Sequence, residues 1–343
     1  MVGGAGAAGS ARAGAGPAGC GEVARFSPRG PREPADTLAG GVLAPLRPLL
    51  PPPPAVSDRL AVLPQYLLPK QALTQLMGRL AGARSGALTT AVIRWFIGRY
   101  GVDMAEAANP DPAAYASFND FFTRALRPGA RPLAEGADWL CPVDGAISQF
   151  GRIEAGQIFQ AKGHRYSATA LLGGDAARAG AYQDGWFATL YLSPRDYHRI
   201  HMPCDGRLTR MVHVPGALFS VNPTTARGVP GLFARNERVV CHFEGPFGPF
   251  VMVLVGATVV GSMATVWHGV VNPPRPGMPR AWDYAPGQVA LARGAEMGRF
   301  LLGSTVVMLM PPEARLRFNP AWAPARPIRM GEAMADAVRL LET

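Results

Sequence analysis

The feature that most limits how this chain can fold is an uncharged, mostly apolar run at residues 300–309, which is followed by Pro311 and Pro312. Its length and its valines predict a buried strand, because a strand covered on both faces is apolar throughout. We expect it to be an inner strand of a sheet. A Gly-Ser-Thr step at 303–305 interrupts the run, and a glycine inside a strand usually marks a bulge or a close approach of backbone.

The Gly303-Ser304 step can also carry chemistry. Glycine has no Cβ to shield its carbonyl carbon, and the hydroxyl of Ser304 can reach back to that carbon. If a base removed the hydroxyl proton, Ser304 could attack the Gly303 carbonyl and turn the amide into an ester. Elimination would then break the chain and leave a pyruvoyl group at the new amino terminus. The ordinary alternative is a bend whose serine bonds to backbone, and the tripeptide alone favours that alternative.

The amino-terminal 57 residues have a different composition from the rest. They are rich in Gly, Ala and Pro and end close to four consecutive prolines, which is typical of a low-complexity segment with a stiff spacer. They lack the apolar core of a signal peptide. We therefore expect residues 1–57 to lie outside the fold, as a disordered tail or as an upstream extension that the working protein does not use.

Charge indicates the kind of partner. The formal net charge is +10, which points to nucleic acid, an anionic membrane surface or an anionic substrate. Half of this excess lies in residues 58–100. This segment contains six Lys and Arg residues and one Asp, so its net charge is +5. Apolar residues recur at helical spacing over residues 71–100, with a break at Gly86. The two predicted helices either cover a core with solvated basic faces or lie on an anionic bilayer.

From residue 136 onward, short apolar runs alternate with Gly and Pro, which predicts many short antiparallel strands. The uncharged stretch 250–267 is interrupted by Gly261-Ser262 and fits two buried strands with a turn better than a membrane span. The sequence thus predicts an α+β fold with amino-terminal amphipathic helices and a mainly antiparallel β core. The expected division is a tail at 1–57, a helical membrane-associating region at 58–135 and a β-rich catalytic domain at 136–343.

Two stretches could supply a base for Ser304. Asp144 stands in Cys-Pro-Val-Asp-Gly, where Asp-Gly is also a common hairpin turn. His198 and His201 stand three apart in Tyr-His-Arg-Ile-His-Met-Pro-Cys, and histidines can transfer protons near neutral pH. With Cys204 these histidines could instead bind a metal, but a fourth ligand at zinc-motif spacing is missing, so we expect no metal.

Asp144, His201 and Ser304 also follow the order Asp, His, Ser that one class of hydrolases uses. A hydrolase nucleophile normally sits on a turn that is exposed to substrate. A serine in the middle of a strand, after a glycine, is better placed to attack its own chain.

Taken together, these stretches resemble the bacterial phosphatidylserine decarboxylases. The most specific matches are Leu-Gly-Ser-Thr at 302–305 with the residues that precede it, and the segments 191–203, 232–239 and 256–262. The resemblance extends from about residue 62 to about residue 312. Residues 1–57 have no counterpart in the family pattern, and the linker before Val289 is short and divergent.

The resemblance implies a proenzyme that cuts itself between Gly303 and Ser304. Residues 1–303 would form a large chain and residues 304–343 a small chain, with Ser304 converted to a covalent pyruvoyl group that serves in place of pyridoxal phosphate. By the same resemblance, Asp144, His201 and Ser304 form the relay for self-cleavage. His198 is assigned to decarboxylation.

The pyruvoyl carbonyl would condense with the amine of phosphatidylserine and accept electrons when CO2 leaves, giving phosphatidylethanolamine in phospholipid biosynthesis. Weaker candidates for binding the substrate phosphate are Lys162, His164 and Arg235.

The implied partners are phosphatidylserine in an anionic membrane and the enzyme's own two chains as a heterodimer, with a dimer of heterodimers as a further assembly. No nucleic-acid partner is expected. The implied location is the cytoplasmic side of the cell membrane, as a peripheral protein. Two alternatives stay open on the residues alone: a lipid serine hydrolase that uses the triad without self-cleavage, and a non-enzymatic β-rich membrane adaptor in which Ser304 is structural.

Overall fold

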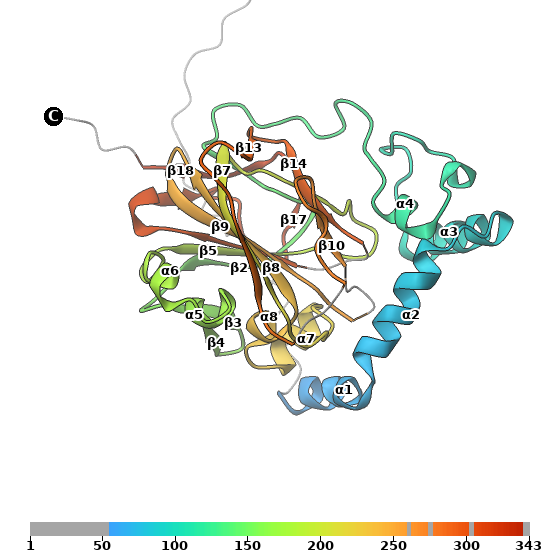
Figure 1. Cartoon of the computed structure of the whole chain (residues 1–343), viewed down its shortest axis with the longest axis horizontal. Coiled ribbons are helices and arrows are strands. Elements are labelled where there is room, and N and C mark those ends of the chain that lie inside the picture. The colour runs from blue at the N-terminus through green and yellow to red at the C-terminus, as the bar shows by residue number, and fades with distance from the viewer. Residues whose placement is uncertain (1–54, 259–261, 274–276, 302–304, 339–343) are drawn as a thin grey trace, which may run out of the picture. The chain divides into compact units, whose positions relative to one another are not determined.

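The computed structural model describes residues 55–258, 262–273, 277–301 and 305–338. Amino-terminal helices are followed by a β core in which every ladder between named strands is antiparallel (Figure 1). The predicted α+β class is therefore confirmed.

The first three helices are α1 (Ala55–Leu67), α2 (Lys70–Gly82) and α3 (Ala87–Tyr100). The last two confirm the helical pair expected over residues 71–100, and the break lies at Gly86, the residue before α3. The first helix begins at Ala55 and so includes the last three residues of the predicted tail, 55–57. It contacts the core through α7, because the buried carboxylate of Asp58 pairs with Arg227 of that helix.

The remaining helices are short and lie between strands. They are α4 (Phe118–Phe122), α5 (Ala168–Leu171), α6 (Ala176–Gly180), α7 (Pro223–Gly228) and α8 (Leu232–Arg235), with 3₁₀ turns at Pro112–Ala114 and Pro312–Ala314. Several begin at a residue whose side chain caps the first turn. Ser117, for example, accepts a hydrogen bond from the backbone N–H of Asp120, which satisfies one of the donors left free at a helix start.

The largest sheet has nine strands. In spatial order they are β12 (Arg280–Asp283), β7 (Gly206–Val214), β8 (Arg238–Gly245), β9 (Gly248–Val255), β15 (Thr305–Met310), β5 (Trp186–Tyr191), β2 (Gly145–Arg152) and β17 (Pro327–Ile328), with β13 (Ala290–Leu291) also paired to β7.

Three smaller sheets complete the core. One contains β11 (Gly269–Val270), β10 (Met263–Thr265), β14 (Glu296–Phe300) and β6 (Arg199–His201). A second contains β1 (Trp139–Leu140), β18 (Ala333–Ala337) and β16 (Leu316–Phe318), and a third is the hairpin of β3 (Gln157–Ala161) and β4 (His164–Ser167). The prediction of two strands within 250–267 is confirmed by β9 and β10; residues 259–261 lie outside the described part.

Strand β15 is an inner strand of the large sheet, as expected, with β9 on one side and β5 on the other. Its side chains alternate between two hydrophobic clusters. Val307 and Leu309 pack in one, and Val306, Met308 and Met310 pack in the other. Burial on both faces explains why this stretch is apolar throughout.

The prediction of a single strand over residues 300–309 is wrong. Phe300 ends β14 in the four-stranded sheet, whereas Thr305 begins β15 in the nine-stranded sheet. Phe300 shares a hydrophobic cluster with Val306 and Met308. An apolar pattern cannot distinguish one long strand from two short strands that border the same core. Ser304 was placed mid-strand on that basis, and residues 302–304 lie outside the described part.

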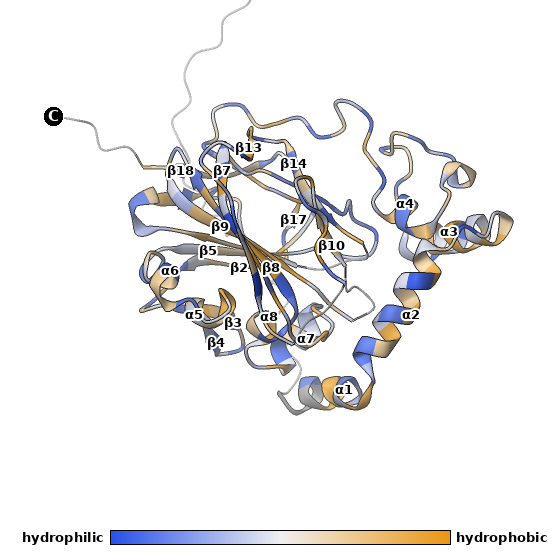
Figure 2. Ribbon diagram, viewed as in Figure 1, coloured by the Kyte–Doolittle hydropathy of each residue, from blue (hydrophilic) through white to orange (hydrophobic). Residues whose placement is uncertain are grey.

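The apolar stripes of α2 and α3 only partly cover the core. Ile93 is buried and Phe96 and Ile97 pack against the core, but Leu76, Leu80, Leu88 and Val92 are exposed. Figure 2 shows hydrophobic and hydrophilic residues mixed along α1, α2 and α3. No helix in the described ranges is long and apolar enough to cross a bilayer.

Candidate active site

The predicted catalytic segments come together where neighbouring strands of the nine-stranded sheet begin or end. This row of strand ends forms one edge of the sheet. Thr305, the first residue of β15, pairs with Tyr191 at the end of β5 and with Val255 at the end of β9. Tyr191 in turn pairs with Ala146 near the start of β2. Asp144 precedes β2, the histidine segment follows β5, and residue 304 precedes β15. Asp144, the histidine segment and Thr305 therefore lie at the same edge.

A glycine allows this close approach. A Cβ on Gly145 would lie 2.2 Å from the backbone oxygen of Tyr191, a distance that no side chain tolerates. Glycine at position 145 is thus required by packing at the sheet edge, and the close approach places Asp144 beside the end of β5.

His198 is held by a turn that its own segment forms. The backbone N–H of Asp196 donates to the oxygen of Ser193 at 3.0 Å, with Pro194 in the second position, where its fixed φ suits a turn. The Asp196 carboxylate accepts a hydrogen bond from the Ser193 N–H at 2.6 Å. His198 Nδ1 then donates to the Asp196 carbonyl at 2.7 Å, since a carbonyl can only accept. Nε2 of the neutral ring must consequently carry a lone pair.

That lone pair has no partner among the described residues. His198 is completely buried, with its ring centroid 4.0 Å from that of Phe122 in α4. Burial lowers the pKa of His198 to about 3, against a smaller opposing effect of the hydrogen bond to Asp196. Its backbone oxygen accepts from the N–H of Phe300 at 3.1 Å, so His198 adjoins the end of β14. His198 is thus a neutral base whose Nε2 lacks a partner among the described residues, and it lies beside Phe300 at the end of β14.

His201 lies at the other end of β6, where it pairs with Glu296 of β14. Its Nδ1 donates to the Gly294 carbonyl at 2.8 Å, which leaves Nε2 as the acceptor. The hydroxyl of Tyr197 donates to that Nε2 at 2.9 Å. Burial lowers the pKa of His201, and the charges of Glu296 and Asp144 partly oppose this effect.

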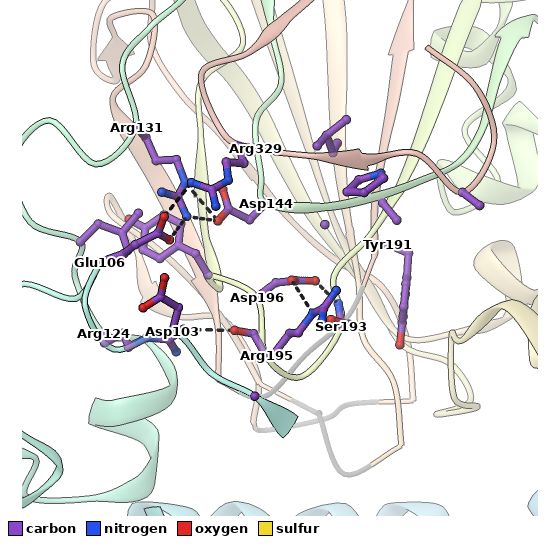
Figure 3. Close-up of a pocket in the computed structure, with 18 residues that line it drawn as sticks. Asp103, Glu106, Arg124, Arg131, Asp144, Tyr191, Ser193, Arg195, Asp196 and Arg329 are labelled. Atoms are coloured by element: carbon purple, nitrogen blue, oxygen red, sulfur yellow. Dashed lines mark hydrogen bonds and ion pairs between the residues drawn. The ribbon is translucent and has the colours of Figure 1, made fainter. Parts of the chain in front are cut away.

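Asp144 makes its hydrogen bonds to other groups (Figure 3). Its carboxylate accepts two bonds from Arg131 Nε, at 2.9 and 3.1 Å, one from Arg131 Nη2 at 2.5 Å, and one from the Met330 N–H at 2.8 Å. Arg131 also pairs with Glu106, which binds Arg329. Asp144 influences the pKa of His201 through its charge. The two segments are also joined by a backbone hydrogen bond, from the His201 N–H to the Pro142 oxygen at 2.9 Å. The relay role of the pair stays a prediction.

A cavity of about 400 Å³ opens at this edge. Its polar lining comes from the segment after α3, from the residues around Asp144, from the turn after β5 and from the carboxyl-terminal part of the chain. The charged and hydroxyl groups that line it are Asp103, Glu106, Arg124, Arg131, Asp144, Tyr191, Ser193, Arg195, Asp196, Tyr197 and Arg329 (Figure 3).

The three candidates for phosphate binding do not line this cavity. Lys162 forms an ion pair with Asp58 of α1, and His164 begins β4. Arg235 places its guanidinium 5.2 Å from the centre of the Phe219 ring. Their proposed role stays a prediction without support from this geometry. Gly303 and Ser304 lie outside the described residues.

Comparisons with known proteins agree with the sequence resemblance. A family model described as phosphatidylserine decarboxylase matches residues 118–336, and a second, described as PSD, matches residues 60–101. A phosphatidylserine decarboxylase proenzyme of an Azoarcus species is 78% identical over 281 residues, which is 82% of this chain and 97% of the relative. Proteins of the same name from Acidovorax ebreus and Dechloromonas aromatica are 75% and 71% identical over 280 and 281 residues, which cover 82% of this chain and 98% and 99% of the relatives.

The chain belongs to the phosphatidylserine decarboxylase family. The resemblance deduced from the sequence is thereby confirmed.

The structure also shows which site residues the sequence alone did not single out. Tyr197 lies inside the segment 191–203 but was assigned no role, and Arg124 and Arg131 lie outside the segments that carry the resemblance. The available signal was a cluster of charges before the Asp-Gly pair, with Glu106, Arg124, Arg127 and Arg131 close in sequence. Sequence spacing could not show that residues 144 and 330 would meet.

Proposed function

We propose that this chain is a proenzyme that cleaves itself between Gly303 and Ser304 and then decarboxylates phosphatidylserine to phosphatidylethanolamine. The observation that carries the proposal is the 78% identity over 97% of a relative named phosphatidylserine decarboxylase proenzyme, together with the intact Leu-Gly-Ser-Thr motif at 302–305. Cleavage would give residues 1–303 and 304–343, which stay associated as a heterodimer through the ladders of β15 with β5 and β9.

The state of His201 suits a general base. The Gly294 carbonyl fixes its tautomer, so Nε2 bears the lone pair that could take the proton of the Ser304 hydroxyl. The lowered pKa keeps the ring neutral, as a base must be. Tyr197 occupies that lone pair here, so its hydroxyl must turn away before Nε2 takes a proton. Once the ring is protonated, the negative charge of Asp144 stabilises it.

The residues around the start of β15 fit a covalent carbonyl cofactor made from Ser304. Two buried polar atoms in this region, His198 Nε2 and Thr305 Oγ1, have no partner among the described residues. The Thr305 hydroxyl can donate a hydrogen bond to a carbonyl built at position 304, whereas His198 Nε2 carries a lone pair and can accept one from the Ser304 hydroxyl before cleavage. Such a pyruvoyl group supplies an electron sink for carboxylate loss. His198 enters neutral and can only accept a proton at Nε2; it donates to the substrate Cα only after it has been protonated.

The proposed location is an anionic membrane, as a peripheral protein on the cytoplasmic side, and the surface of helices α1–α3 supports the membrane attachment. They expose large apolar side chains to solvent, including Leu67, Leu88 and Trp95. Arg79, Arg94 and Arg99 are exposed on α2 and α3, and Arg84 is exposed in the connection between these two helices. Such a surface binds anionic bilayers by apolar insertion and charge attraction. The cavity is lined by Gly101 and Asp103, directly after α3, so a lipid headgroup in it would lie near this surface.

The proposal is tested by supplying phosphatidylserine in vesicles and measuring both products. Wild-type protein should release one CO2 for each phosphatidylethanolamine formed, with no free fatty acid. Ser304→Ala, which has no hydroxyl, should release none. Release of fatty acid or free serine without CO2 would favour the lipid hydrolase instead, and absence of any turnover would favour the adaptor.

A further inference from the structure

Arg124 is a buried cation whose hydrogen bonds are incomplete. Its residue is 5% exposed, yet its guanidinium makes one hydrogen bond, from Nη2 to the Arg195 carbonyl at 3.2 Å. Nε and Nη1 have no partner among the described residues. Its guanidinium also lies 5.4 Å from the centre of the Phe121 ring. A buried donor without an acceptor is costly, so these two nitrogens require an explanation.

Arg238 shows how this fold satisfies an arginine whose role is structural. It is 3% exposed, and its Nε, Nη1 and Nη2 donate to the carbonyls of Leu171, Asn236 and Ala170 at 2.7, 2.8 and 2.6 Å. The same chain therefore provides three acceptors for one buried guanidinium and a single acceptor for the other. Among the described arginines, Arg124 is the one with two buried nitrogens that lack a partner.

The acidic groups near Arg124 do not neutralise it by direct contact. Asp144 and Glu106 are bound to Arg131, and Asp196 accepts from the Ser193 backbone. No carboxylate in the described part of the chain lies within ion-pair distance of Arg124. Burial lowers the pKa of Arg124, but an arginine side chain still stays protonated. The site therefore holds a desolvated positive charge.

The open nitrogens belong to a residue that lines the 400 Å³ cavity at the sheet edge. Tyr191, another wall of this cavity, pairs with Thr305, so the cavity adjoins the residue that follows position 304. Phe122, two residues before Arg124, packs on the ring of His198. A ligand group bound to Arg124 would thus lie at the same end of the sheet as the reacting groups.

We propose that Arg124 binds the phosphodiester of the lipid headgroup, which makes it a specificity residue of the active site. This inference rests on the proposed decarboxylase function. Arginine is the preferred partner of phosphate, because its planar guanidinium offers several donors to the phosphate oxygens. The substrate carboxylate is a poorer binding partner for Arg124 than the phosphodiester. Its charge disperses as CO2 leaves, so an ion pair with it would stabilise the ground state more than the transition state and slow the reaction.

The test uses Arg124→Gln and a soluble short-chain phosphatidylserine, so that membrane binding does not enter. Loss of a charge-assisted hydrogen bond should raise KM about tenfold to hundredfold. The turnover number should stay within about twofold, because binding of this kind is equal in the ground and transition states. The matched control is Arg207→Gln, which removes an exposed arginine paired with Glu244 and should change neither constant. A fall in kcat with unchanged KM, or no change in either, would overturn the proposal.

Direct binding separates this inference from the proposed reaction. Glycerophosphoethanolamine carries the phosphodiester but no carboxylate, and calorimetry should show that it binds wild-type protein and binds Arg124→Gln at least tenfold more weakly. L-Serine carries the carboxylate but no phosphate, and its binding should not depend on Arg124. The opposite pattern would assign Arg124 to the carboxylate and overturn the proposal. A wild-type protein that binds the phosphodiester through Arg124 yet releases no CO2 would instead contradict the decarboxylase function.

If Arg124→Gln does not fold, Arg124→Lys decides by the same measurement. It keeps the charge but presents a single ammonium group, so KM should rise above that of the wild type and glycerophosphoethanolamine should still bind, more weakly than to the wild type. Wild-type constants for Arg124→Lys, or loss of kcat alone, would refute the proposed role.

Discussion

Exposed apolar side chains on α1–α3 should dominate membrane binding. We consider the triple substitution of Leu67, Leu88 and Trp95 by serine, one change on α1 and two on α3. These residues are 88%, 66% and 62% exposed, so they contribute little to the core. Burying a large apolar side chain is worth about 1.5–3 kcal/mol. Scaled by the exposed fractions, the three together contribute up to roughly 3–6 kcal/mol at the bilayer.

This magnitude can be compared with that of the charges. Each of Arg79, Arg84, Arg94 and Arg99 is worth about 1 kcal/mol at an anionic surface in low salt, and less as salt screens it. The two contributions are similar at low salt, but the apolar one persists at high salt. The triple variant should therefore lose more than about a hundredfold in partitioning to phosphatidylserine-containing vesicles at high salt. Reversal of the four arginine charges should matter only at low salt.

Vesicle sedimentation over a salt series measures both effects. Thermal unfolding serves as a control, because substitutions at exposed positions should change stability by only about 0.5 kcal/mol. Partitioning of the triple variant equal to that of wild type at high salt would refute the assignment of α1–α3 to the membrane. A truncation for such work should remove residues 1–54 and not 1–57, since α1 begins at Ala55.

Three further predictions follow from the site. His201→Ala and Asp144→Ala should accumulate as uncut precursor on a denaturing gel, whereas His198→Ala should be cut but decarboxylate poorly; an uncut His198→Ala beside a processed His201→Ala would reverse the assignment. His198 has a pKa of about 3 when folded and 6.5 when unfolded, so its contribution to stability is complete above pH 6.5 and declines as pH falls. Between pH 7 and pH 5, His198→Phe should lose less stability than wild type, by on the order of 2 kcal/mol in chemical denaturation, and equal losses would contradict this. Arg131→Met leaves Asp144 without its ion-pair partner and Glu106 paired only with Arg329, and should cost about 3–5 kcal/mol in the same assay. Arg165→Met, which breaks an exposed pair, should cost at most about 1 kcal/mol, and similar losses for the two variants would refute the structural role of Arg131.

The elements that sequence predicted correctly are those with a strong periodic or apolar signal. The helical spacing over 71–100 identified α2 and α3, and the apolar stretches at 250–267 and 300–309 identified β9 and β15. The run at 300–309 failed because β14 and β15 border one hydrophobic cluster. A local apolar pattern does not show that the chain passes from one sheet to another.

The candidate site was predictable where a motif carried it and not where tertiary contacts built it. Asp144 and the two histidines were found from short local motifs. The Arg131 contacts with Asp144 and Glu106, and the contact of Asp144 with Met330, depend on chain segments that are distant in sequence. The tautomers of His198 and His201 depend on carbonyls of Asp196 and Gly294, which only the folded backbone places.

Whether this chain cuts itself at one peptide bond is the central question, and intact-mass spectrometry of the purified, active protein answers it most directly. We predict two polypeptides, with the smaller comprising the 40 residues 304–343 and beginning with a pyruvoyl group in place of Ser304. Ser304→Ala should give one mass, that of the uncut chain, because alanine offers no nucleophile. Active decarboxylase that shows only the full-length mass would contradict the account.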